Sequence, residues 1–240
     1  LEALNTFLIN GDQEKFSSVV GRVESLAHIK YIITLDTDTQ LPRDTAWQMA
    51  AAMSHPLNQP VYDENQQRVV AGYGILQPRV AASLPGNNAS LYAQLSGGEP
   101  GIDPYTRAVS DVYQDAFGEG SFIGKGIYDV ETFERVLKSR FAENRILSHD
   151  LLEGSFVRSG LLSDVQLYEA YPSKYSDDVS RRHRWIRGDW QLAGWIFHKV
   201  KGASGQRQVN PLSVLSRWKI FDNLRRSQVP IAQLLLLTAV

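Results

Sequence analysis

The segment that most constrains the fold of this chain is residues 31–42, YIITLDTDTQLP. Its first half is apolar and rich in β-branched residues, which predicts a buried strand, and the proline predicts a turn after it. Asp36 and Asp38 follow the strand, and because strand side chains alternate between faces, both carboxylates start on the same side. Like charges repel at such a separation, so we expect a cation between them.

Two interpretations of this aspartate pair are open. The carboxyl end of a strand in an α/β sheet is where such folds bind ligands, and carboxylate oxygens suit Mg²⁺ or Mn²⁺. Water and a phosphorylated substrate would complete the coordination of the ion. Alternatively, the pair marks only a turn, since Asp and Thr are ordinary turn residues.

The composition excludes several classes of protein. The chain has 25 Lys and Arg against 26 Asp and Glu, a net charge of −1, which argues against non-specific nucleic-acid binding. It has no cysteine, so disulfides and thiolate zinc sites are excluded, and its histidines show no paired zinc-binding spacing. A length of 240 residues suffices for one large α/β domain.

Hydrophobic patterning predicts a mixed α/β domain without internal repeats. We expect strands at residues 31–35, 68–77 and 163–172, and helices at 14–26, 44–53 and 107–117. Residues 85–104, rich in Gly, Pro, Asn and Ser, form a loop too long for a simple connection, and such loops are often functional.

Asp150 is the candidate general base. It precedes a predicted helix in SHDLLEG, and a carboxylate at a helix start can point into a cleft, where it could accept a proton from a hydroxyl group. Asp150 and Glu153 also match a helix-capping box, and the two roles need not exclude each other.

The segment RRHRW places Arg181, Arg184 and Trp185 three and four residues apart, on one face of a predicted helix. Guanidinium groups match the geometry of a diphosphate, and an indole face can carry a sugar ring. The alternative is a solvated basic helix with a buried tryptophan.

GEGSFIGKG is not a phosphate-binding P-loop. Gly118 and Gly124 lie one residue too far apart for that motif, and Gly126 follows Lys125 where a Ser or Thr would bind magnesium.

The C-terminal part predicts a contact with a membrane. Residues 213–227, SVLSRWKIFDNLRRS, repeat apolar side chains near helical spacing among cations, which suits a helix on an anionic membrane surface. The apolar positions are Leu215, Trp218, Phe221 and Leu224, and the cations are Arg217, Lys219, Arg225 and Arg226. The apolar residues 229–240 stop short of the roughly 20 that span a bilayer, so they are a severed transmembrane helix or a buried core helix.

Taken in order, the D-x-D pair, the aspartate before a helix and R-x-x-R-W resemble processive family-2-like glycosyltransferases with a GT-A fold. A closer resemblance, nearly end to end, is to the glycosyltransferase domain of cyclic β-1,2-glucan synthases, glycosyltransferase family 84. It is carried by TLDTDTQLPRD, GYGILQPRV, GIDPYTRAVSDVYQDAFGEGSFIGKGIYDV, ENRILSHDLLEG, DVSRRHRWIRGDWQ and LSRWKIFDNLRRS.

The resemblance implies a GT-A-type nucleotide-sugar glycosyltransferase core, a mixed sheet flanked by helices, over residues 1–200. The core is expected to lack its first strands, because LEALN is similar to the helix start after the second strand of such domains. An amphipathic membrane-interface segment, 201–227, and the start of a truncated transmembrane helix, 228–240, would follow. The intact protein is expected to carry further domains in the same chain and to be a multi-pass protein of a bacterial inner membrane, active on its cytoplasmic face.

The implied activity is inverting transfer of glucose from UDP-glucose to a growing cyclic β-1,2-glucan. The donor is α-linked and the product β-linked, so one displacement with one general base, Asp150, suffices. Asp36 and Asp38 would hold Mg²⁺ or Mn²⁺ on the donor diphosphate. Arg181 and Arg184 would stabilise the charge of the leaving diphosphate, and Trp185 would stack on the acceptor sugar.

Two alternative functions remain open. One is another processive family-2-like β-glycan synthase, which would share the motifs. The other is a non-catalytic nucleotide-sugar-binding or membrane-docking module. The resemblance further implies that the glucan is built on the protein itself, and Tyr105, with Thr106 second, is the candidate first acceptor. Alternatively, Tyr105 only anchors its loop to the core.

Overall fold

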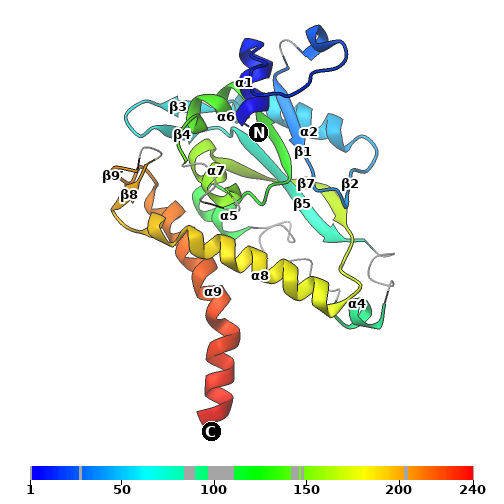
Figure 1. Cartoon of the computed structure of the whole chain (residues 1–240), viewed down its shortest axis with the longest axis vertical. Helices are drawn as coiled ribbons and strands as arrows, with labels where there is room; N and C mark the ends of the chain where they lie inside the picture. The colour runs from blue at the N-terminus through cyan, green and yellow to red at the C-terminus, as the bar shows by residue number, and fades with distance from the viewer. Residues whose placement is uncertain are drawn as a thin grey trace.

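The computed structural model describes residues 2–26, 29–83, 90–96, 111–141, 146, 149–202 and 205–239. At its centre lies a mixed sheet of five strands in the order β1-β6-β5-β7-β2 (Figure 1). These strands are β1 (Tyr31–Thr34), β2 (Thr39–Gln40), β5 (Ile75–Ala82), β6 (Gly126–Asp129) and β7 (Ser159–Glu169). Strands β5 and β7 are parallel and the other neighbours are antiparallel. The predicted mixed sheet flanked by helices is confirmed.

Two hairpins and a set of helices complete the described part of the chain. The hairpins pair β3 (Val61–Asp63) with β4 (Arg68–Ala71), and β8 (Lys199–Lys201) with β9 (Arg207–Val209). The helices are α1 (Glu2–Asn10), α2 (Thr45–Ser54), α4 (Leu91–Ser96), α5 (Val112–Phe117), α6 (Val130–Leu137), α7 (Asp150–Val157), α8 (Tyr175–Gln191) and α9 (Val214–Ala239). Short 3₁₀ turns occur at η1 (Val23–Leu26), η2 (Pro56–Asn58) and η3 (Ala193–Ile196).

Alternate residues of β5 and β6 serve two hydrophobic clusters on opposite faces of the sheet. Ile75 pairs with Tyr128, and both belong to the larger cluster, which contains residues of α1, α6 and α7. Leu76 pairs with Ile127, and both belong to a second cluster with Met49 of α2. Because neighbouring strand residues point to opposite faces, helices cover both faces (Figure 1).

Three predictions about secondary structure were wrong in detail. Residues 85–104 were expected to be a loop, but they contain the helix α4 (Leu91–Ser96). The helix expected at residues 14–26 is absent apart from η1, and Gly21 there has a positive φ of 116°. The strand expected at residues 68–77 is divided into β4 and β5 at Gly72, where φ is 63°. A Cβ at Gly72 would lie 1.9 Å from the carbonyl oxygen of Gln59, so only glycine fits this turn.

We expect Gly72→Ala to lower the free energy of unfolding by about 2–4 kcal/mol, because the new methyl group collides with backbone and the positive φ is strained. Chemical denaturation of this chain measures the change. Gly194→Ala is the matched control, since a Cβ there meets no atom within 4 Å. Equal losses in the two variants would contradict the prediction.

The C-terminal segment is one continuous helix, α9, whose first half packs on the core. Lys219 is buried, and its Nζ lies 3.4 Å from Oε1 of Glu119. Leu224 is also buried, whereas Trp218 and Phe221 are exposed. The prediction that Lys219 and Leu224 face a membrane is therefore wrong, because both side chains are used to dock α9 on the domain.

The end of α9 extends away from the domain (Figure 1) and exposes Leu234 to Leu237. Within the described residues, α9 and the other helices all lack the length or the apolar character needed to cross a membrane. The domain boundary predicted at residue 200 falls inside β8 (Lys199–Lys201).

Candidate active site

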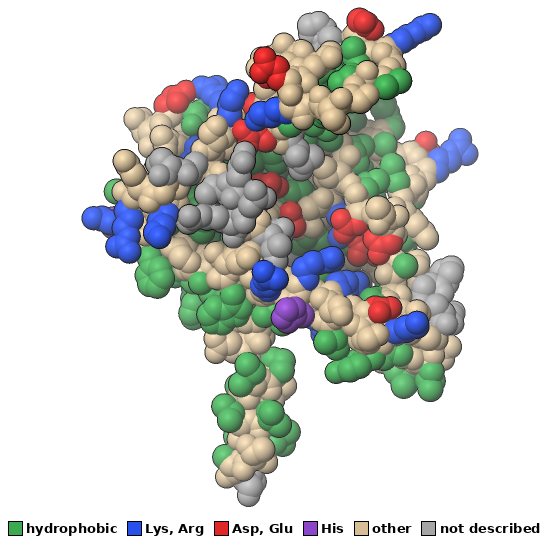
Figure 2. All heavy atoms as spheres, in the orientation of Figure 1, with side chains coloured by type: hydrophobic (Ala, Val, Ile, Leu, Met, Phe, Trp, Pro, Cys, Tyr) green, Lys and Arg blue, Asp and Glu red, His purple; other side chains and the backbone are tan. Residues whose placement is uncertain are grey.

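A pocket of about 440 Å³ brings together three of the predicted donor-binding residues. It is lined by Asp38, Ala170, Tyr171, Pro172, Asp177, Ser180, Arg181 and Arg184. Asp38 comes from the connection between β1 and β2, and the two arginines come from α8. Acidic side chains gather beside β2, and basic side chains follow α8 across from them (Figure 2). A carboxylate and two guanidinium groups therefore converge on one volume.

Strand pairing explains how these distant residues meet. Strand β2 begins at Thr39, directly after Asp38, and Thr39 pairs with Glu169 at the end of β7. The chain then continues through Ala170 to Pro172, which line the pocket, and α8 begins at Tyr175. The D-x-D segment is thus fixed beside the start of α8 by the short ladder between β2 and β7.

Arg181 is held in place by a buried aspartate. Asp178 accepts hydrogen bonds from Arg181 at 3.0 Å, from Arg182 at 2.8 Å and from the Tyr92 hydroxyl at 2.8 Å. Burial works against ionisation of Asp178, but the hydrogen bonds from Tyr92, Arg182 and Arg181 outweigh it and lower the pKa of the carboxyl group. Asp178 therefore stays charged and fixes the guanidinium of Arg181 at the pocket.

Trp185 lies against Arg181 on α8. The guanidinium carbon of Arg181 is 4.7 Å from the centroid of the Trp185 ring and 5.5 Å from that of Tyr171. Both contacts are within the range of cation–π interactions. Trp185 is half-buried and Arg184 is exposed.

Beside Asp36, the structure places the ammonium group of Lys125. Its Nζ lies 2.9 Å from Oδ2 of Asp36 and 2.8 Å from Oε1 of Glu169. Burial lowers the pKa of Lys125, but the charges and hydrogen bonds of Glu169 and Asp36 outweigh it, and the pKa is raised. A cation was expected between Asp36 and Asp38, and at Asp36 a lysine supplies it.

The residues present fit a divalent ion that binds together with a diphosphate. Among the residues that the structure describes, no three His, Cys, Asp or Glu side chains gather to hold a metal alone. Asp38 is exposed and lines the pocket, and the Asp36 side chain is 63% exposed. Mg²⁺ is commonly bound by one or two carboxylates plus substrate phosphates. Asp38 and Asp36 are therefore enough protein ligands for such an ion.

Asp150 is the first residue of α7. The N-cap of α7 is His149, which makes no side-chain capping bond, and the amide of Glu153 donates to the His149 carbonyl oxygen at 2.8 Å. The capping-box interpretation is therefore wrong. The Asp150 carboxyl group lies against Gly124, where a Cβ would come within 3.1 Å of Oδ2.

Two ionisable neighbours of Asp150 favour their neutral forms. Burial, followed by the charge of Asp150, raises the pKa of Glu153 to about 8. Burial also lowers the pKa of His149, although the charge of Asp150 opposes this shift. At neutral pH, Glu153 is mostly protonated and His149 mostly uncharged, so neither competes with Asp150 as a charged group.

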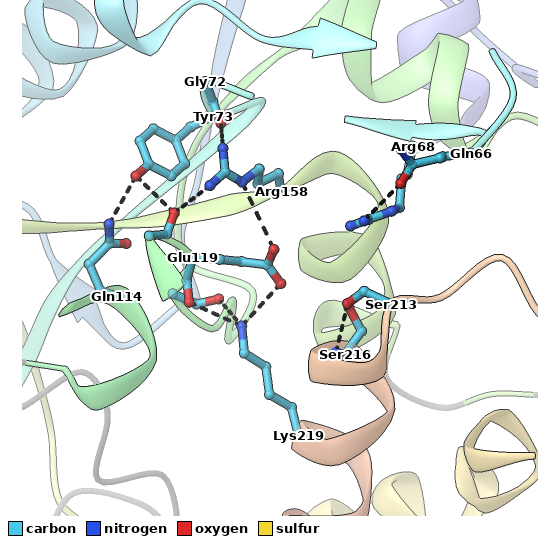
Figure 3. Close-up of polar contacts among 12 residues, drawn as sticks. Gln66, Arg68, Gly72, Tyr73, Gln114, Glu119, Arg158, Ser213, Ser216 and Lys219 are labelled. Carbon is cyan, nitrogen blue, oxygen red and sulfur yellow. Dashed lines mark hydrogen bonds and ion pairs between the residues drawn. The ribbon is translucent and has the colours of Figure 1, made fainter. Parts of the chain in front are cut away.

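The loop of residues 118–125, which carries Gly124 and Lys125, is anchored at its start by buried polar contacts (Figure 3). Lys219 of α9 donates to the Gly120 carbonyl oxygen at 2.7 Å. Arg158, which follows α7, donates to the Gly118 carbonyl oxygen at 2.8 Å. Lys219 of α9 and Arg158 after α7 therefore hold the start of the loop that reaches the site.

Sequence reasoning missed Lys125, Glu169 and Asp178. Asp178 could have been found from its spacing of three residues before Arg181, which allows an ion pair on a helix. Tyr105 and Thr106 lie outside the described residues. A second cavity, of about 360 Å³ near β8 and β9, is lined by none of the predicted site residues.

Comparison with known proteins gives one strong similarity. No protein-family model matches the chain. The chain is 48% identical over 235 residues to the cyclic beta-(1,2)-glucan synthase NdvB of Rhizobium meliloti (strain 1021). The match covers 98% of this chain but spans only 8% of the length of that relative.

Proposed function

We propose, from the premise that this chain is homologous to one segment of a cyclic β-1,2-glucan synthase, that it carries the glucosyltransferase site of such an enzyme. The reaction would be inverting transfer of glucose from UDP-glucose to a growing β-1,2-glucan, in a GT-A-type core. The observation that carries this proposal is the convergence of Asp38, Arg181 and Arg184 on one pocket.

The pocket suits the diphosphate of a nucleotide sugar. Its volume of about 440 Å³ lies within the range of small-molecule sites. Guanidinium groups bind phosphate oxygens through charge-assisted hydrogen bonds, and Arg181 is already fixed by Asp178. We assign Arg181 and Arg184 to the leaving diphosphate, where preorganised positive charge lowers the barrier.

Asp38, with Asp36 beside it, would hold Mg²⁺ or Mn²⁺. The ion would add positive charge on the diphosphate oxygens when the donor is bound.

Asp150 is assigned as the general base and Trp185 as the acceptor platform. Inversion at C1 needs one base that accepts the proton of the attacking hydroxyl group, and the carboxyl group of Asp150 lies close to Gly124 in the loop that also carries Lys125. The half-buried indole of Trp185 offers an apolar surface for a sugar ring of the growing glucan.

The test is incubation of the intact synthase in membranes with labelled UDP-glucose, followed by linkage analysis. We expect label in β-1,2-linked glucan. Label in another β-linkage would favour a different processive β-glycan synthase. UDP-glucose binding without transfer by the intact protein would favour a non-catalytic nucleotide-sugar-binding module.

The membrane contact is part of the proposal. The exposed leucines at the end of α9 and the exposed Trp218 and Phe221 suit a position at a membrane surface. The first half of α9 stays docked on the core, so Trp218 and Phe221 would meet the membrane surface, and the helix from residue 228 onward would enter the membrane. The site would act on the cytoplasmic face of a bacterial inner membrane, together with other domains of a longer chain.

We also propose Tyr105, with Thr106 second, as the residue on which the first glucose is placed. Mass spectrometry of the intact synthase after incubation with UDP-glucose is expected to find a hexose ladder on Tyr105 and none in Tyr105→Phe. Full labelling of Tyr105→Phe, or a ladder elsewhere, would show that Tyr105 only anchors its loop.

A further inference from the structure

We propose that Asp36 and Glu169 form a cation site that the chain fills with its own lysine, and that Lys125 thereby positions Asp36 beside the donor pocket. The cation site is independent of the proposed function. Only the role of Lys125 in placing Asp36 for glucose transfer rests on the proposed function. The Gly-Lys-Gly segment thus has a role although it is not a P-loop.

The three side chains come from separate parts of the fold. Asp36 lies in the connection between β1 and β2, Lys125 directly before β6, and Glu169 at the end of β7. The Lys125 ammonium lies 2.9 Å from Asp36 Oδ2 and 2.8 Å from Glu169 Oε1, which are distances of strong charged hydrogen bonds. Thr39 donates a longer bond, 3.4 Å, to the same Glu169 oxygen.

The burial of these groups is unequal. The side chains of Lys125 and Glu169 are 10% and 13% exposed, whereas that of Asp36 is 63% exposed. A carboxylate as buried as Glu169 is strongly unfavourable without a counter-charge. Glu169 therefore anchors the lysine, and the lysine holds the more accessible Asp36 by one oxygen.

The glycines on either side of Lys125 allow a backbone conformation and a close approach that other residues would not accept. Gly124 has a φ of 87°, and Gly126 a φ of 154° with a notional Cβ only 2.3 Å from the carbonyl oxygen of Leu76. Side chains at these positions would be strained or would collide, so the backbone passes close to β5. The ammonium group itself is held by its ion pairs with Asp36 and Glu169.

The two carboxylate oxygens around this nitrogen could supply part of the coordination of a divalent ion, with water completing it. Such ions bind oxygen at about 2.0–2.6 Å, so a small contraction would let Mn²⁺ replace the ammonium. The unsubstituted chain needs no divalent ion between Asp36 and Glu169, because Lys125 already supplies a positive charge there. In the donor pocket, a metal ion would then be bound by Asp38 and by the exposed side of the Asp36 carboxyl group.

The test is titration of this chain with Mn²⁺, without nucleotide, followed by electron paramagnetic resonance of the free ion. We expect Lys125→Met to gain one Mn²⁺ site that binds about tenfold tighter than any site in the unchanged chain. Lys125→Met/Glu169→Gln should lose this gain, and Lys125→Arg, which keeps the charge, should not acquire it.

Thermal unfolding is the second measurement, since an ion that binds only the folded chain raises the melting temperature. Mn²⁺ should raise the melting temperature of Lys125→Met more than the melting temperature of the unchanged chain. A folded Lys125→Met chain without the new site, a gain that survives Glu169→Gln, or a Lys125→Met chain that stays unfolded in millimolar MnCl₂ would each overturn the proposal. No readout depends on glucose transfer, so failure of the proposed function leaves this result intact.

Discussion

Asp150→Asn is expected to lower the rate of glucose transfer by the intact synthase about 10²- to 10⁴-fold while UDP-glucose binding stays nearly unchanged. The amide keeps the size of the side chain but cannot accept the proton of the acceptor hydroxyl. Because Gly124 places no side chain against the Asp150 carboxyl group, an amide of the same shape fits the same space. The measurement is kcat and KM for UDP-glucose, with donor binding followed separately.

Glu153→Gln is the matched control for this change. Glu153 lies one helical turn beyond Asp150, and its pKa of about 8 keeps it mostly protonated at neutral pH, so glutamine imitates its usual state. We expect at most a few-fold loss of rate. If Asp150→Asn binds UDP-glucose poorly but turns over normally once saturated, Asp150 belongs to the donor site and is not the base.

Parts of the site that depend on local spacing were predicted from the sequence. Arg181 and Arg184 lie one turn apart on a helix in any fold that keeps the helix, so their shared direction follows from their spacing. Asp36 and Asp38 follow a strand whose apolar pattern is clear, and that strand is present as β1. The structure adds that Asp38 and the two arginines line the same pocket.

Parts that depend on contacts between distant segments were not predictable in this way. Lys125 meets Glu169 because β6 and β7 flank β5 in the sheet, an order that no single segment encodes. Lys219 looked like a membrane-facing cation, since its helix is amphipathic, but a buried carboxylate and carbonyl groups on a distant loop bind it. In both cases the partner decides the role of the lysine, and the partner is remote in sequence.

A contact between distant segments also explains why the single strand predicted at residues 68–77 is two strands, β4 and β5. Apolar residues recur throughout residues 68–77, so the pattern alone favours a single strand. Gly72 interrupts it because the backbone of Gln59 passes too close for any side chain. A glycine in a strand pattern is a signal for such an approach, but it does not identify the segment that approaches.

Asp38→Ala is expected to lower metal-dependent glucose transfer by the intact synthase about 10²- to 10³-fold, the effect typical of losing one preorganised electrostatic contact to a transition state. Asp38 is the D-x-D carboxylate that lines the pocket with Arg181 and Arg184, whereas Asp36 is already bound to Lys125. Without Asp38, the diphosphate loses the protein ligand that best fits a shared ion, so the Mn²⁺ concentration needed for half-maximal rate should also rise.

Asp177→Ala is the matched control, because Asp177 lines the same pocket, is exposed and carries the same charge. It lies in the first turn of α8, outside the D-x-D pair, so its removal should leave the metal dependence unchanged. Rates measured over a Mn²⁺ series for both variants separate a specific ligand from a general loss of negative charge. Unchanged metal-dependent transfer in Asp38→Ala would mean that the pocket binds the donor through its arginines and that the metal assignment is wrong.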